Sequence, residues 1–213
     1  MDFTPKQRVR AALKAPSSDL QRLCEENTTQ VLDLLYVARR SSELGAPLKQ
    51  AVWSLLEKNM RVLCAASSLG WDAKKKHAEM FHRFSRFILV FQGPEPLAEN
   101  LVAFSMFRFE NEEEYCVLYC YELQVNEEMR GMGIGRCLMN VLECIGSEWR
   151  MQKLMLTVLK ANKNAVKFYA TVGFQIDVSS PTNFGYKEDY EILSRVLEEE
   201  DFDFEEAPPN TNH

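Results

Sequence analysis

The chain has 213 residues, 46% of them hydrophobic and 26% charged, and its formal net charge is −6 at pH 7. This length and composition fit one globular domain with a sizeable core. No apolar run approaches the roughly 20 residues of a membrane-spanning helix, and no basic patch with interleaved aromatic residues is present, so we expect neither membrane nor direct nucleic-acid binding.

Helices and strands of the first half are predicted from capping residues and hydrophobic periodicity. Thr4 and Pro5 begin a short helix in an N-terminal helical extension, residues 1–27. Apolar and β-branched residues predict the first strand at 28–38, and apolar residues at helical spacing predict a helix at 47–66. Asp72 can cap a further helix that ends near His82, with the lysines at 74–76 on its exposed face.

Strands and helices alternate in the second half. A Gly-Pro-Glu-Pro loop and an acidic loop at 110–114 connect three predicted strands, and Gly173 ends the last predicted helix. The order predicts an α/β fold in a single domain, residues 28–196, with a mixed, mostly antiparallel central sheet flanked by helices. Strands are predicted at 87–91, 98–109, 116–125, 154–159, 174–178 and 189–196, and helices at 134–149 and 162–172.

The negative charge is concentrated at the C-terminal end. Residues 198–206 contain seven acidic residues and no basic one, so the rest of the chain has 25 basic and 24 acidic residues. We therefore predict an acidic, disordered tail over residues 197–213. The alternative is a weak binding site for a basic partner.

The six cysteines show no C-x-x-C spacing. Cys116 and Cys120 are four residues apart on a predicted strand, about 13 Å at the usual rise, too far for a disulfide or for one shared metal ion. With three scattered histidines, we predict no structural metal site. This cysteine usage indicates a reducing compartment, the cytosol or the nucleus.

A glycine-rich loop, RGMGIG at residues 130–135, connects an apolar strand to a helix. Glycines leave backbone N–H groups accessible, and a helix N-terminus attracts negative charge, so the loop suits the phosphates of a cofactor. The loop is not a dinucleotide-binding fingerprint, because Arg136 occupies the position of the third glycine. It is not a P-loop either, because Gly135 is followed by Arg136 and Cys137 instead of Lys and Ser or Thr. The alternative is a glycine-rich turn without a ligand.

The pattern Arg130-x-x-Gly133-x-Gly135 resembles the pyrophosphate-binding signature of the GNAT superfamily of acetyl-CoA-dependent N-acetyltransferases. The strand LYCYELQV, this loop, the strand KLMLTVLK and an Asn-x-x-Ala-x-x-Phe-Tyr helix starting at Asn162 follow in GNAT order and spacing. More narrowly, residues 45–196 are similar to the NatD family of histone-specific Nα-acetyltransferases. The segments that carry this similarity are FRFE, VLYCYELQV, LTVLKANKNA, FQIDVSSP and YEILSR.

The resemblance implies a GNAT fold and an enzyme that acetylates a free N-terminal serine amine from acetyl-CoA, by direct attack in a ternary complex. The implied substrates are the Ser-Gly-Arg-Gly N-termini of histone H4 and histone 2A. We therefore expect a monomer in the nucleus and cytoplasm, with the ribosome or chromatin as further partners. A broader GNAT enzyme acting on other N-termini or lysines, and a catalytically silent acyl-CoA- or histone-binding module, are the alternatives.

The strand YCYEL contains the predicted catalytic residues, Glu122 and Tyr121. An N-terminal amine has a pKa near ~7.7–8, so a carboxylate acting directly or through water is a sufficient base. Glu122 is the only acidic residue in this strand and is the predicted general base. The alternative role for Glu122 is a carboxylate at the end of the strand that pairs with an Arg or Lys side chain. In a regular strand Tyr119, Tyr121 and Leu123 share one face, and Cys120 and Glu122 share the other. Both catalytic residues reach a substrate only if the strand bends or splays, as the resemblance implies.

Further contacts follow from the resemblance. Tyr169 is a candidate general acid for the leaving thiolate, or else an aromatic core residue, and Asn162 is a cofactor contact or simply a helix cap. Glu110 is expected to pair with the substrate arginine. Cys64 stands where the family has a peptide-contacting tyrosine. The implied cofactor contacts are Leu123, Gln124, Val125, Arg130, Gly131, Met132, Gly133, Ile134, Gly135, Arg136, Asn162 and Ser180. The implied substrate contacts are Trp71, Glu110, Tyr119, Tyr121, Thr157 and Tyr190.

Overall fold

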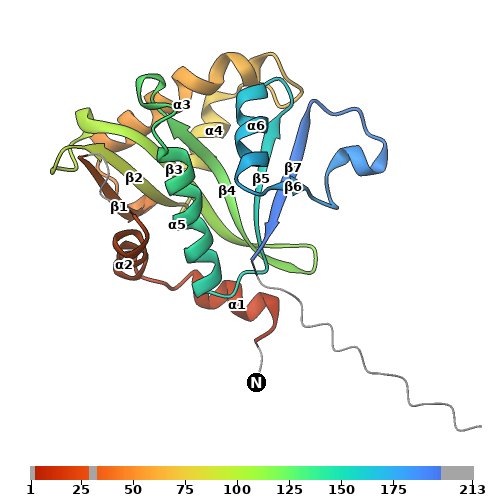
Figure 1. Cartoon of the computed structure of the whole chain (residues 1–213), viewed down its shortest axis with the longest axis horizontal. Coiled ribbons are helices and arrows are strands. Elements are labelled where there is room, and N and C mark those ends of the chain that lie inside the picture. The colour runs from red at the N-terminus through yellow and green to blue at the C-terminus, as the bar shows by residue number, and fades with distance from the viewer. Residues whose placement is uncertain (1–2, 29–32, 198–213) are drawn as a thin grey trace, which may run out of the picture.

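One seven-stranded sheet organises the computed structural model, which describes residues 3–28 and 33–197. The strand order is β1-β2-β3-β4-β5-β7-β6, and every neighbouring pair is antiparallel except β4 and β5 (Figure 1). This is the predicted α/β fold with a mixed, mostly antiparallel sheet. The strands are β1 (Leu34–Arg40), β2 (Arg86–Gln92), β3 (Leu101–Glu112), β4 (Tyr115–Val125), β5 (Lys153–Leu159), β6 (Gln175–Ile176) and β7 (Tyr190–Val196).

Six α-helices cover the two faces of the sheet in the described residues (Figure 1). Alternate residues of β2 face opposite sides: Ile88 and Val90 belong to the core that contains buried residues of α1, α2 and α5, whereas Phe87 and Leu89 pack with α3 and α4. The helices are α1 (Pro5–Ala12), α2 (Ser17–Asn27), α3 (Ala46–Ala65), α4 (Ala73–Met80), α5 (Ile134–Glu148) and α6 (Lys163–Thr171).

The helix boundaries follow the local signals in the sequence. Thr4 precedes α1 with Pro5 in its first turn, and the Asp72 carboxylate accepts hydrogen bonds from the backbone N–H groups of Lys74 and Lys75, both at 3.0 Å. Gly173, with φ +88°, lies just after α6. No helix in the described part of the chain is long and apolar enough to span a membrane.

Some predicted boundaries were wrong. The first strand runs from Leu34 to Arg40 rather than over residues 28–38, of which 29–32 lie outside the described residues. Residues 98–100 form a 3₁₀ turn, and β3 continues to Glu112, so the predicted acidic loop is only a two-residue turn. The strand predicted at 174–178 is reduced to two residues. Of the tail predicted at 197–213, all but Leu197 lies outside the described residues.

Two irregularities in β4 shape the centre of the sheet. Met106 pairs with Glu122 and Phe107 with Cys120, so Tyr121 has no partner in β3 and forms a β-bulge. On its other side, β4 pairs with β5 only from Val117 to Cys120, and beyond this point the two strands separate. The bend and splay that the catalytic prediction required are therefore both present in β4.

Candidate active site

A cavity of about 1030 Å³ opens where the pairing of β4 with β5 ends. Seven consecutive residues of β4, from Tyr119 to Val125, line it, together with the C-terminal half of β5 and the glycine-rich loop. Helices α3, α4 and α6 complete the wall through Asn59, Lys76, Glu79, Phe168 and Tyr169, among others. The cavity thus brings together the predicted catalytic strand and the predicted cofactor loop.

The glycine-rich loop presents its backbone to this cavity. In the described residues, none of the six consecutive backbone N–H groups from Gly131 to Arg136 has a hydrogen-bond acceptor. Gly131 and Gly133 have φ of +80° and +84°, and Gly135 lies so close to α6 that a Cβ there would be 3.2 Å from the ring of Phe168. Free N–H groups at the N-terminus of α5 fit the phosphates of a nucleotide-containing cofactor.

Substitution of Gly133 tests the cofactor site. No atom lies within 4 Å of a Cβ built at this position, so Gly133→Val introduces backbone strain of about 1–2 kcal/mol and places a side chain beside the free N–H groups. We expect the KM for the predicted cofactor, acetyl-CoA, to rise about tenfold or more. The matched control is Gly93→Val, because Gly93 has φ +87° and equally open surroundings but lies in the β2–β3 loop. Equal KM changes in steady-state kinetics of both variants would contradict this role.

The other predicted cofactor contacts differ in position. Leu123, Gln124, Val125, Ile134 and Arg136 line the cavity, as does Asn162, which also caps α6 by accepting a hydrogen bond from the Ala165 N–H at 3.3 Å. The Arg130 guanidinium donates to the backbone oxygen of Val125 at 3.3 Å and to Asn59 Oδ1 at 3.0 Å. Met132 is half exposed and does not line the cavity.

Ser180 is also outside the cavity lining, although its neighbour Ser179 is part of it. The buried Ser180 hydroxyl donates to Glu191 Oε2 at 2.6 Å and accepts from the backbone N–H of Ile192 at 2.9 Å. These bonds hold the segment before β7 against that strand. The structure therefore gives Ser180 a structural role at the edge of the site, and its predicted cofactor contact remains a prediction.

The bulge places Tyr121 and Glu122 on the same side of the sheet. Tyr121 packs with the core under α3 and α4, and Glu122 contacts α4, whereas Cys120 and Leu123 pack on the opposite face. The alternation of a regular strand is therefore interrupted at this point, as the resemblance implied. As a result, both predicted catalytic side chains line the cavity.

Glu122 is a buried carboxylate with two partners. Its Oε1 lies 2.7 Å from Lys76 Nζ, and its Oε2 accepts a hydrogen bond from Gln124 Nε2 at 2.8 Å. The lysine pairing that the sequence left as an alternative is thus present, within the cavity. The prediction that all three lysines at 74–76 face outward was wrong for Lys76, whose side chain is 25% exposed and also contacts Glu79 at 2.5 Å.

The charges around Lys76 favour its ammonium form. Burial on its own disfavours the charged amine, but the carboxylates of Glu122 and Glu79 outweigh burial and raise the pKa of Lys76 above its usual value. Lys76 is therefore an ammonium group near neutral pH, beside Glu122, rather than a candidate base.

Four of the predicted substrate contacts, Tyr119, Tyr121, Thr157 and Tyr190, line the cavity. The Tyr119 and Tyr121 rings lie 5.0 Å apart. The Tyr119 hydroxyl is hydrogen-bonded to Thr157 Oγ1 of β5 at 2.6 Å. Burial, assisted by the carboxylates of Glu112 and Glu110, raises the pKa of Tyr119 to about 12. Burial and Glu110 raise the pKa of Tyr121 as well. Both hydroxyls are therefore protonated near neutral pH.

Trp71 and Glu110 do not line the cavity. The Trp71 ring packs against Trp53 of α3 at 5.7 Å between centroids. The Glu110 carboxylate accepts a hydrogen bond from the Tyr121 hydroxyl at 2.8 Å and lies 3.7 Å from Arg108. Glu110 thus holds the hydroxyl group of Tyr121 by a hydrogen bond from outside the cavity lining. Direct substrate contacts of Glu110 and Trp71 remain predictions.

Glu112, which was not among the predicted site residues, lines the cavity instead. Burial, with the neighbouring carboxylates of Glu110 and Glu113, raises the pKa of Glu112. The surroundings of this carboxylate therefore disfavour its negative charge, and a cationic ligand would offset the repulsion from its neighbours. The missed signal was the extent of β3, because Glu112 was assigned to a loop.

Tyr169 is a further residue of the cavity wall. Its side chain is buried and lines the cavity, but its hydroxyl has no hydrogen-bond partner among residues 3–28 and 33–197. Burial, with Cys120 and Glu122 nearby, raises the pKa of Tyr169 well above its usual value. The position agrees with both predicted roles, a proton donor in the site and an aromatic core residue.

Two loops meet beside the site. Ser68, in the α3–α4 loop, donates its hydroxyl to Asp189 Oδ1 at 2.6 Å and its backbone N–H to Asp189 Oδ2 at 2.7 Å. The adjacent residues, Leu69 and Tyr190, both line the cavity. Cys64, which the resemblance aligned with a peptide-contacting tyrosine, lines it too. The cavity is thus bounded on this side by two loops that bind each other.

The splayed sheet and the adjacent loop of free backbone N–H groups fit a protein that binds a phosphate-containing cofactor, such as the acetyl-CoA that the resemblance implies. The sequence model of the acetyltransferase (GNAT) family matches residues 52–174, more than half of the chain, and the protein belongs to this family. Acetyl-CoA is its acetyl donor, consistent with the fit of the loop to phosphates.

Solved structures of acetyltransferases share the fold. An acetyltransferase from Streptococcus agalactiae has a TM-score of 0.58 and 13% identity over 78% of this chain and 99% of its own. A chain of the NatC complex bound to Gag peptide and CoA has a TM-score of 0.57 and 13% identity, covering 78% and 100%. Ard1 from Thermoplasma volcanium has a TM-score of 0.52 and 16% identity, covering 77% and 99%. At these identities the likeness is one of fold.

Proposed function

We propose that the protein is an Nα-acetyltransferase that acetylates the N-terminal serine amine of Ser-Gly-Arg-Gly sequences, those of histone H4 and histone 2A, as in the NatD family that the sequence resembles. The observation that carries this proposal is the bulge at Tyr121. It turns Tyr121 and Glu122 into one cavity, next to the free N–H groups of the cofactor loop.

The residues of the cavity divide the reaction between them. Bound acetyl-CoA supplies an electrophilic thioester carbonyl. Glu122 accepts a proton from the substrate amine, directly or through water, as the nitrogen–carbon bond forms. Tyr169 is the candidate donor of a proton to the thiolate that leaves as the carbon–sulfur bond breaks. The unpaired edge of β4 from Leu123 to Val125 offers backbone groups that can orient the acyl chain.

The walls also support the proposed substrate. Tyr119, Tyr121 and Tyr190 form an aromatic slot that suits small residues such as serine and glycine. Glu112 is the cavity carboxylate with surroundings that favour a cationic partner, and it is our candidate for pairing with the third-position arginine.

The proposed domain boundaries, oligomeric state and cellular location are those expected from the sequence. We place the acetyltransferase domain at residues 28–196, preceded by a helical extension at 1–27 and followed by the acidic segment at 197–213. With histone substrates, the protein acts as a monomer in the nucleus and cytoplasm, where the ribosome or chromatin presents the histone N-terminus.

The test is an acetylation assay of the purified protein with acetyl-CoA, read by mass spectrometry against a panel of peptides. We expect acetylation of the Ser-Gly-Arg-Gly peptide at its α-amine, and much less of peptides that begin with other sequences. Comparable turnover of unrelated N-termini or of internal lysines would instead indicate a broader enzyme. Acetyl-CoA binding without transfer to any peptide would indicate a silent binding module.

A further inference from the structure

A continuous series of polar contacts runs through Glu122 and connects α4 to the cofactor loop. On one side, Glu122 Oε1 meets Lys76 at 2.7 Å, and Lys76 meets Glu79. On the other side, Glu122 Oε2 accepts from Gln124, whose Oε1 accepts from Asn59 Nδ2 at 3.0 Å. Asn59 Oδ1 then accepts from Arg130 at 3.0 Å. Both oxygens of the candidate base are therefore held by donors from separate elements.

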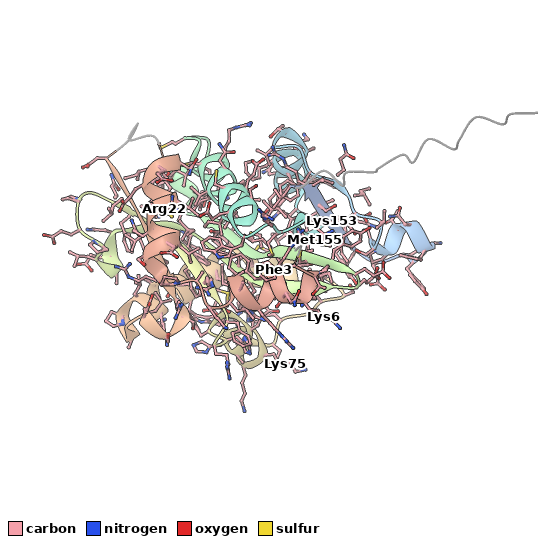
Figure 2. All side chains as sticks on the ribbon, turned by 90° about the horizontal axis from the view of Figure 1, so that it is seen from below. Phe3, Lys6, Arg22, Lys75, Lys153 and Met155 are labelled. Atoms are coloured by element: carbon pink, nitrogen blue, oxygen red, sulfur yellow. The ribbon has the colours of Figure 1, made fainter. Side chains whose placement is uncertain are left out.

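Lys76 differs from the lysines beside it. Lys75 lies one position earlier on α4, and its side chain is 87% exposed and points away from the body of the protein (Figure 2). Lys76 is directed inward and contributes to the cavity wall. Two of its three ammonium N–H groups have carboxylate partners, Glu122 and Glu79.

We propose that Lys76 is a positioning residue of the acetyl transfer, acting through Glu122; this rests on the proposed function, in which Glu122 is the base. Lys76 holds Oε1 while Gln124 holds Oε2, which fixes the plane of the carboxylate in the cavity wall. A carboxylate has about four acceptor sites, so two remain for the substrate amine or a water molecule. Lys76 also gives the buried carboxylate a partner of opposite charge at 2.7 Å, and a buried charge without such a partner is strongly disfavoured.

The chemistry of the pair argues against a purely structural bond. A buried ion pair stabilises a fold weakly compared with apolar packing of similar volume. Here the pair lies at the wall of the cavity, beside the β-bulge, where the orientation of one carboxylate decides whether a proton can be transferred. Small displacements of a catalytic group are enough to lower turnover about 100-fold.

The experiment is a double-mutant cycle between Lys76→Met and Glu122→Gln, with kcat and both KM values measured on the best acceptor peptide. We expect Lys76→Met to lower kcat about tenfold or more with the KM for acetyl-CoA unchanged within about twofold, and Lys76→Arg to restore most of the loss. In the Glu122→Gln background, Lys76→Met should lower kcat less than twofold further, because residues that act as a unit are not additive. Lys75→Met is the matched control, and its kcat and KM values should equal those of the wild type.

A second readout is independent of turnover. Urea unfolding of the same four proteins gives their free energies of unfolding, and the changes caused by Lys76→Met and Glu122→Gln should not be additive. If Lys76→Met does not fold, Lys76→Gln replaces it in both cycles. If Glu122→Gln retains wild-type kcat, the catalytic assignment in the proposed function is wrong and the positioning role is overturned with it. If Glu122→Gln is impaired but Lys76→Met has wild-type kcat, or if the two losses are additive, the positioning role alone is overturned.

Discussion

Glu122→Gln should lower kcat about 100-fold or more at neutral pH while leaving acetyl-CoA binding intact. The amide has nearly the same shape as the carboxylate and keeps an oxygen near Lys76, but it cannot accept the proton of the substrate amine. The deficit should shrink above about pH 8, where the substrate amine loses its proton without help from a base.

Three measurements separate this outcome from a general loss of structure. Isothermal titration calorimetry gives the Kd for acetyl-CoA, thermal unfolding gives the stability, and a pH series of kcat gives the dependence on the base. Turnover of Glu122→Gln equal to that of the wild type near pH 7 would remove Glu122 from the role of general base.

Glu112→Gln should weaken binding of a Ser-Gly-Arg-Gly peptide by roughly 1.5–3 kcal/mol, the usual scale of a hydrogen bond to a charged group. This corresponds to an increase in peptide KM of about 10- to 150-fold. The folded protein should become slightly more stable in the same variant. The raised pKa of Glu112 means that folding disfavours its charged form, so a neutral side chain removes a repulsion that is present above the unfolded-state pKa of this carboxyl group.

The peptide itself supplies the control for this prediction. Replacing the third-position arginine of the peptide with alanine should raise the peptide KM of the wild-type protein. With this alanine peptide, the wild type and Glu112→Gln should have the same KM. Glu114→Gln is the matched variant, because Glu114 is in the same hairpin but exposed and outside the cavity. A loss that is equally large for the arginine and alanine peptides would contradict the pairing.

Local signals predicted most of the fold. Asp72, Pro5 and Gly173 act within one helical turn of their own positions, so their effects on helix ends were visible in the sequence. The loop at 130–135 was also predictable, because its conformation depends on glycines that take positive φ. The sheet itself followed from the order of elements, since one crossover helix, α5, separates the parallel strands β4 and β5.

The site was harder to predict because its geometry depends on pairing partners distant in sequence. The bulge at Tyr121 exists only relative to β3, and nothing in YCYEL itself breaks the alternation. Lys76 was assigned to the surface because its two neighbouring lysines suggested a solvated face, yet the rotation of α4 against the sheet turns it to Glu122. Glu112 was missed for a similar reason, since the length of β3 is set by its pairing with β4.

The pairing between β4 and β5 joins the two parts of the sheet over a short stretch. Four residues of each strand, Val117–Cys120 and Lys153–Leu156, connect β1–β4 to β5–β7. Two side-chain contacts add to this pairing: the Tyr119–Thr157 hydrogen bond between β4 and β5, and the Ser68–Asp189 contact between the α3–α4 loop and the residue before β7. The two parts of the sheet are thus held together beside the cavity by a short backbone pairing and by these side-chain contacts.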